Sequence, residues 1–312
     1  MTAVGLDLGG TALKYVVLDS RDDVVERGQV PVRPGDALDL VVRTARELIS
    51  GHSSQAVGVG LAGLVTYPDG EFVWGPHLSG HAVPYRAALR DALGFAVAVD
   101  NDANLAAHAE WFVGAGEQVD PMVMVTLGTG IGVGCVIDGQ VYRGASFAGE
   151  AGHIEMLPDG GECSCGRRGC WETLVSGAVL DRSAAELAVA DPTGPVAIHA
   201  DGSPSTGVHL ALAAEAGDVG AVRALSEAGG WLGRGIANLI LMLDPRRVVV
   251  GGAAAAAGPI LFSAAQHVVA AAMSGSAFRT EVPIVPARFG TWSGAVGAAL
   301  AGRRVHNGRD EW

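Results

Sequence analysis

The same local pattern can be read twice in this 312-residue chain: a strand, a tight turn of glycine and threonine, and a second strand. The copies span residues 3–19 and 121–138, and both are rich in apolar and β-branched residues on either side of the turn. The turns are Gly9-Gly10-Thr11 and Gly128-Thr129-Gly130. Each copy alone is compatible with an ordinary β-hairpin. Two copies about 120 residues apart predict a duplicated α/β fold.

The first turn is preceded by Asp7 and followed by Lys14, the only lysine in the chain. It resembles the phosphate loop of the superfamily that contains sugar kinases, Hsp70 and actin. In that superfamily an aspartate at the end of the first strand faces magnesium, while backbone N–H groups of the turn approach the phosphates. The turn is not a P-loop, because no Gly-Lys-Ser/Thr follows it, and it is not G-x-G-x-x-G.

Three of the four cysteines lie within eight residues, and a histidine precedes them. Cys163, Cys165, Cys170 and His153 together offer three thiolates and an imidazole, which is the ligand set of a closed tetrahedral zinc site. Four protein ligands leave no open position, so the zinc is expected to be structural. Buried thiols without a metal are the alternative. A disulfide is disfavoured because nothing else in the chain indicates an oxidising compartment.

Two carboxylates, Glu150 and Glu172, flank this cluster. An ion that fixes His153 and the cysteine loop also fixes these carboxylates, which suit a ligand rich in hydroxyl groups.

A short strand at residues 95–100 leads into Asn101 and Asp102, which open a helix. Asparagine or aspartate at such a position can simply cap the helix. Alternatively, Asp102 is a general base that accepts a proton from a hydroxyl as it attacks phosphorus.

These motifs, in this order, resemble those of the ROK family, named for repressors, open reading frames and kinases. The resemblance covers nearly the whole chain and implies an actin-like (ribonuclease H-like) ATPase fold, α/β in class, with two lobes and a cleft between them. It implies a small N-terminal lobe at residues 1–108 and a large lobe with the zinc loop at 109–290. Residues 291–312 would form a final helix that returns to the small lobe, and a tail.

The resemblance also implies roles for individual residues. Asp102 would be the catalytic base. The sugar would be held by Gly63, Asn101, Asp102, Glu150, His153 and Glu172. ATP and Mg²⁺ would be held by Asp7, Gly9, Gly10, Thr11, Lys14, Gly128, Thr129, Gly130, Gly251 and Gly252. Locally, the Gly251-Gly252 pair can equally be an ordinary strand-to-helix turn.

The implied activity is an ATP-dependent hexose 6-kinase similar to bacterial glucokinases. Two departures bear on the substrate. Ala62-Gly63 replaces the usual Pro-Gly pair of family glucokinases, and His77 and His81 replace an amide and a large aromatic side chain that lie near the sugar. A modified hexose such as the amino sugar kanosamine is therefore an alternative to glucose.

Charge and the position of the first turn argue against other classes of function. The net charge of −12 argues against nucleic-acid binding, which depends on clustered lysine and arginine. A ROK repressor would carry a DNA-binding segment before the phosphate loop, which here begins at Asp7; a sugar-sensing pseudokinase is disfavoured by the two turns and Asp102. The sequence shows neither a signal peptide nor an apolar span, so we expect a cytoplasmic enzyme. We also expect it to form a homodimer or homotetramer.

Periodicity predicts a helix at residues 36–50 and one or two helices within 218–243. A final helix is expected at 293–304, followed by a frayed polar tail. The stretch 191–207, with its prolines and polar residues, is expected to be a mobile loop.

Overall fold

The computed structural model describes residues 1–273 and 275–309. The chain divides into two compact units. The first contains Met1–Met124, Val133–Gly149 and Ala287–Trp312, and the second contains Val125–Gly132 and Glu150–Pro286. Compared with the expected boundaries, the first unit thus extends beyond residue 108. The reason is that the helix Asp102–Val113 packs against strands of the N-terminal part, and the strand Ile131–Ile137 packs closely on this helix at Gly134.

The first unit is built on a five-stranded sheet with the order β3-β2-β1-β4-β7. Strands β1, β2 and β3 are antiparallel neighbours, whereas β4 runs parallel to β1 and β7 runs parallel to β4. The strands are β1 (Ala3–Leu8), β2 (Ala12–Leu18), β3 (Val24–Pro31), β4 (Val57–Leu61) and β7 (Ala98–Asn101). A small ribbon, β5 (Leu64–Val65) and β6 (Phe72–Trp74), follows β4.

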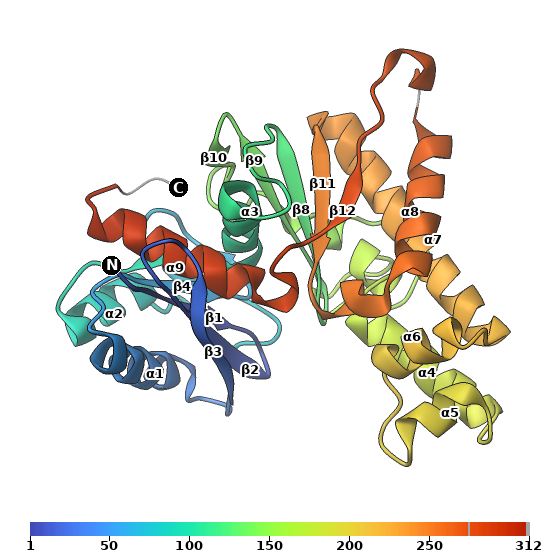
Figure 1. Ribbon diagram of the computed structural model, residues 1–312, viewed down its shortest axis with the longest axis horizontal. Helices are drawn as coiled ribbons and strands as arrows, with labels where there is room; N and C mark the ends of the chain where they lie inside the picture. The colour runs from blue at the N-terminus through green and yellow to red at the C-terminus, as the bar shows by residue number, and fades with distance from the viewer. Residues whose placement is uncertain (274, 310–312) are drawn as a thin grey trace. The chain divides into compact units, whose positions relative to one another are not determined.

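Helices cover both faces of this sheet (Figure 1). Helices α1 (Ala37–His52) and α2 (Tyr85–Leu93) contribute to the apolar core on one face. Helix α9 (Ser293–His306) lies on the other face, and α3 (Asp102–Val113) packs against α9. The approach of α9 requires glycine in the strands, because a Cβ atom at Gly5 would lie 1.9 Å from the Ala295 carbonyl oxygen. The same distance separates a Cβ at Gly58 from the Ala298 carbonyl oxygen.

A second five-stranded sheet has the order β10-β9-β8-β11-β12. Its strands are β8 (Met122–Leu127), β9 (Ile131–Ile137), β10 (Gln140–Val141), β11 (Arg247–Gly251) and β12 (Ile284–Pro286). The expected repeat is therefore present, since a glycine turn joins β1 to β2 and another joins β8 to β9.

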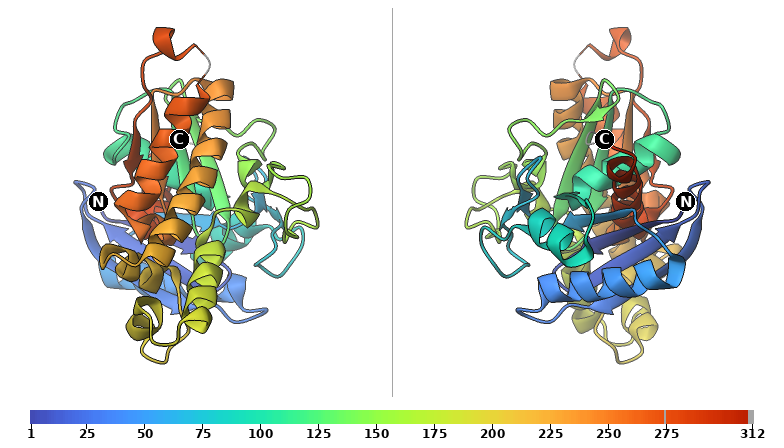
Figure 2. Two further views of the ribbon diagram at one scale, coloured as in Figure 1. Left: turned by 90° about the vertical axis from the view of Figure 1, so that its right-hand side faces the viewer. Right: turned by 90° about the vertical axis from the view of Figure 1, so that its left-hand side faces the viewer.

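The helices of the second unit are α4 (Gly177–Ala190), α5 (Pro195–Ala200), α6 (Gly207–Glu215), α7 (Val219–Leu243) and α8 (Pro259–Ala272). Helices α7 and α8 run side by side (Figure 2). Gly229 and Gly233 of α7 allow this contact, since a Cβ on either would meet the backbone of α8 within 2.5 Å.

The helix predictions at residues 36–50, 218–243 and 293–304 are confirmed as α1, the single helix α7, and α9. The predicted loop at 191–207 is wrong in part, because it contains α5. Pro195 is the first residue of this helix, where a missing N–H costs nothing, so proline here starts a helix rather than preventing one. The tail prediction extends to residues 310–312, which lie outside the described residues. Among the helices that the structure describes, none is long and apolar enough to cross a membrane.

Candidate functional site

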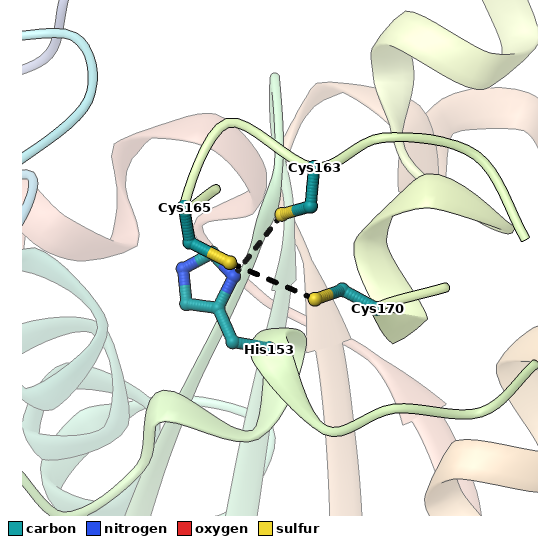
Figure 3. Close-up of side chains that lie close together, drawn as sticks. All are labelled: His153, Cys163, Cys165 and Cys170. Carbon is teal, nitrogen blue, oxygen red and sulfur yellow. Dashed lines mark hydrogen bonds between the residues drawn. The ribbon is translucent and has the colours of Figure 1, made fainter. Parts of the chain in front are cut away.

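The four predicted metal ligands converge in the second unit (Figure 3). One ligand atom from each of His153, Cys163, Cys165 and Cys170 lies within 4.8 Å of the others. The sulfurs of Cys165 and Cys170 are 3.7 Å apart, and the Cys163 sulfur is 3.5 Å from His153 Nδ1.

These separations fit zinc. Zn–S bonds of about 2.3 Å and Zn–N bonds of about 2.0 Å in a tetrahedron place two sulfurs about 3.8 Å apart and a sulfur and a nitrogen about 3.5 Å apart. In the described part of the chain this is the one group of histidine, cysteine or acidic side chains close enough to hold a metal ion in this way. Cys135, the fourth cysteine, is buried in β9 outside the cluster.

The metal loop is anchored to helix α7 through Trp171. This side chain is buried, and its indole N–H donates to the Trp231 carbonyl over 2.9 Å. A Cβ atom at Gly235 of α7 would lie 2.0 Å from the Trp171 ring, so glycine is needed at this contact. The position of the loop on the unit is therefore set by packing as well as by its ligands.

Glu172 links the metal loop to the second glycine turn. Its Oε1 atom lies 2.9 Å from the Cys163 sulfur and 3.5 Å from His153 Nδ1. Its other oxygen accepts a hydrogen bond from the Ile131 N–H over 3.4 Å. As a thiol, Cys163 donates to this carboxylate. If the cluster held zinc, Cys163 would be a thiolate, and the charge of the ion would offset the two neighbouring negative charges.

Glu150 is the first residue of a short 3₁₀ helix that ends at His153. Its carboxylate lies 3.9 Å from His153 Nε2, the ring nitrogen that faces away from the cysteines. Desolvation raises the pKa of Glu150, His153 lowers it, and Glu172 raises it further. Glu150 and Glu172 therefore each lie within 4 Å of one nitrogen of the His153 ring.

Two glycine segments approach each other in the same unit. The Gly177 N–H donates to the Gly128 carbonyl over 2.7 Å, and Gly252 follows β11 with a φ of 85°. A Cβ atom at Gly252 would lie 2.3 Å from the Leu127 carbonyl oxygen. The turn after β11 therefore packs directly on the end of β8, and only glycine fits at position 252 because any side chain there would clash with the backbone.

In the first unit, Asn101 is the N-cap of α3. Its Oδ1 accepts from the N–H groups of Ala103 and Asn104, and its Nδ2 donates to the Gly63 carbonyl over 3.1 Å. The cap is therefore Asn101, while Asp102 occupies the first helical position. A carboxylate there is stabilised by the positive end of the helix dipole.

Asp7, the residue before the last one of β1, pairs with Lys14 of β2. The Lys14 ammonium donates to the Thr291 carbonyl over 3.1 Å, and a Cβ atom at Gly294 would lie 2.8 Å from Asp7 Oδ2. Burial raises the pKa of Asp7 to about 6, although the charge of Lys14 lowers it. A carboxylate in this setting favours a bound cation, which fits the expected magnesium position beside the first glycine turn.

The two histidines of the divergent segment do not occupy equivalent positions. A Cβ atom at Gly10 would lie 2.5 Å from His77 Cβ, so His77 packs on the first glycine turn. His81 is exposed, and its Nδ1 lies 2.6 Å from the Val73 carbonyl oxygen.

One buried ion pair next to the candidate site could not be predicted from the sequence. Asp100 and Arg143 form a buried ion pair with an N–O distance of 2.8 Å, directly beside Asn101. Asp100 was recognised only as a strand end, and Arg143 lies 43 positions away, so no local pattern links the two residues.

The chain is similar to known proteins over nearly its whole length. The family model described as the ROK family matches residues 3–304. The glucokinase of Streptomyces coelicolor is 33% identical over 303 residues, which cover 95% of this chain and 96% of that protein. The xylose repressor of Bacillus subtilis is 26% identical over 255 residues, which cover 79% of this chain and 62% of that protein.

The fold is also similar to that of solved ROK family structures. A ROK family glucokinase from Streptomyces griseus in complex with glucose and AMPPNP superposes with a TM-score of 0.90 at 33% identity, covering 97% of this chain and 100% of that one. A ROK hexokinase from Thermus thermophilus has a TM-score of 0.78 at 31% identity, with 99% and 100% covered.

Proposed function

Because this chain belongs to the ROK family and has its actin-like ATPase fold, we propose that it is an ATP-dependent hexose kinase. It transfers the γ-phosphate to the 6-hydroxyl of glucose or a close analogue. The observation that carries this proposal is the start of α3, where Asp102 places a carboxylate at the first helical position, next to Asn101, whose side-chain amide donates to the Gly63 carbonyl.

In the proposed reaction, Asp102 accepts the proton of the sugar hydroxyl as the hydroxyl oxygen attacks the γ-phosphorus. The bond between the γ-phosphorus and the bridging oxygen breaks, and ADP leaves. Gly63, Asn101, Glu150, His153 and Glu172 bind sugar hydroxyls. The carboxylate, amide and imidazole groups of these residues suit such a ligand.

The nucleotide is assigned to Asp7, Gly9, Gly10, Thr11 and Lys14 in the first unit and to Gly128, Thr129, Gly130, Gly251 and Gly252 in the second. A magnesium ion beside Asp7 would neutralise charge on the phosphates. The cluster of His153 and three cysteines would hold a structural zinc, whose role is to fix the carboxylate of Glu172.

An amino sugar is a second candidate substrate, on account of His77 and His81. We favour glucose, because His77 packs with its backbone and Cβ on the glycine turn assigned to the nucleotide, and the exposed His81 has its Nδ1 2.6 Å from the Val73 carbonyl oxygen. We therefore expect the double variant His77→Asn, His81→Trp to leave the ratio of kcat/KM for glucose to that for glucosamine within about 2-fold, whereas a site that hydrogen-bonds the amino group would change it strongly.

A sugar-binding regulator is the alternative of a different class, since the xylose repressor shares part of its length with this chain. ADP release measured with a panel of glucose, mannose, glucosamine, N-acetylmannosamine and kanosamine separates these functions. The proposal predicts turnover with at least one hexose, highest with glucose. A protein that binds a sugar from the panel but releases no ADP with any of them is a sensor or pseudokinase.

A further inference from the structure

The buried ion pair of Asp100 and Arg143 lies directly beside Asn101 in the first unit, and no step of the proposed reaction uses it. Asp100 is 1% exposed and Arg143 is 9% exposed. Asp100 Oδ2 accepts from Arg143 Nε over 2.8 Å and lies 2.8 Å from Arg143 Nη2. Both charges are thus removed from water and satisfied by each other.

The other oxygen of Asp100 holds the start of α3. Oδ1 accepts from the Asn101 N–H over 2.7 Å and from Asn104 Nδ2 over 3.1 Å. The carboxylate therefore fixes the backbone immediately before Asp102 and the helix turn immediately after it.

Arg143 also contacts two other segments of the first unit. Its Nη1 donates to the Val141 carbonyl over 3.0 Å, and its guanidinium carbon lies 4.0 Å from the centre of the Tyr67 ring. The Tyr67 N–H in turn donates to Ser146 Oγ over 3.1 Å. Tyr67 follows β5 and Gly63, whereas residues 144–149 lead along the chain into Glu150.

We propose that Arg143 is a positioning residue, which through Asp100 and Tyr67 sets the geometry of Asp102 and of the segment that carries Gly63. This inference rests on the proposed kinase function. Its physical basis is that a buried ion pair adds little net stability compared with apolar residues of similar volume, because desolvation offsets the attraction. A planar guanidinium with fixed donors does hold several segments in one geometry.

The conservative variant Arg143→Lys is the first test. Lysine keeps the charge but loses the fork of donors and the stacking on Tyr67, so we expect kcat to fall by about 10- to 100-fold, the scale of a small misplacement of reacting groups. The KM for the sugar should rise, whereas the KM for ATP should stay within about 2-fold, because the described hydrogen bonds of Asp100 hold the start of α3, which the proposal assigns to the sugar. Arg303→Lys is the matched control, since Arg303 pairs with Asp22 and the Asp19 carbonyl elsewhere in the same unit.

The double variant Asp100→Asn, Arg143→Met separates positioning from stability. It removes both charges together and avoids a lone buried ion, so the protein should fold. Low kcat in a folded double variant, with faster amide exchange at residues 101–104, is the expected result. A double variant with the kcat of the wild type would overturn the proposal.

If the protein is not a kinase, the wild type releases no ADP with any hexose. The effect of the Asp100–Arg143 ion pair on the start of α3 is then tested by amide exchange alone. If kinase activity is present and Arg143→Lys matches Arg303→Lys in kcat and both KM values, only the positioning role is wrong.

Discussion

The carboxylate of Glu172 lies 2.9 Å from the sulfur of Cys163, while its second oxygen accepts a hydrogen bond from the N–H of Ile131. One side chain therefore contacts both the metal loop and the glycine turn between β8 and β9. A change at the metal cluster should reach the ligand-binding residues through this contact.

We expect Cys165→Ser to lower the zinc content below one ion per chain and to weaken sugar binding by about 10-fold or more, the range seen when residues around a metal are lost. Cys165 does not itself contact Glu172 in the structure, so the effect on sugar would be indirect. Zinc is measured by mass spectrometry of the metal, and sugar affinity by calorimetry. Cys135→Ala, which alters a buried cysteine outside the cluster, should change neither. Full sugar affinity in metal-free protein would show that the metal cluster does not support the residues assigned to the sugar.

Asp102→Asn should reduce kcat by about 100-fold or more, the usual contribution of a general base. The replacement has the same shape, so the melting temperature, the zinc content and the affinity for sugar should remain near those of the wild type. Steady-state kinetics and calorimetry measure these quantities. Near-normal turnover would mean that Asp102 serves only the start of the helix.

Much of this arrangement could be predicted from sequence because it is local. The spacing of Cys163, Cys165 and Cys170 identifies the metal loop, and the glycine turns identify the repeated strands. Contacts between distant segments could not be predicted in this way. Asp100 and Arg143 meet because β7 and the segment after β10 are brought together by the fold, and the contact of His77 with Gly10 depends on a turn 67 positions earlier in the chain.

Two glycines of α7 should respond in opposite ways to substitution by alanine. At Gly235 a Cβ atom would lie 2.0 Å from the Trp171 ring, so Gly235→Ala should lower the free energy of unfolding by about 1–3 kcal/mol. At Gly230 nothing lies within 4 Å of the added atom, and Gly230→Ala should raise stability by up to about 1 kcal/mol through helix propensity. Urea denaturation of both variants gives the values. Equal effects at the two positions would show that Trp171 is not packed as described.

Acid should destabilise the first unit through His108. This side chain is 2% exposed, stacks on Phe112, and has no hydrogen-bond partner for Nε2. Burial, and then the charges of Arg304 and Arg143, lower its pKa to about 3. Unfolded histidine titrates near 6.5, so as the pH falls below that value the unfolded chain binds a proton that the folded chain does not. This costs about 2 kcal/mol of unfolding free energy between pH 7 and pH 5.

His108→Phe removes the titrating group and keeps a ring against Phe112. Its unfolding free energy should therefore fall by about 2 kcal/mol less than that of the wild type over the same pH interval, whatever other groups contribute. Urea unfolding at the two pH values measures this difference, with the exposed His306→Gln as control. An unchanged pH dependence in His108→Phe would show that His108 is protonated in the folded protein.

The most direct measurement of the proposed function is ADP release with glucose and with 6-deoxyglucose, with the phosphorylated product identified by ³¹P NMR. The account predicts one ADP for each glucose phosphorylated at the 6-position, and no ADP release above the sugar-free rate with 6-deoxyglucose. Equal release with both sugars would contradict the assigned position of transfer, and no release with glucose or any other hexose would contradict the kinase activity itself.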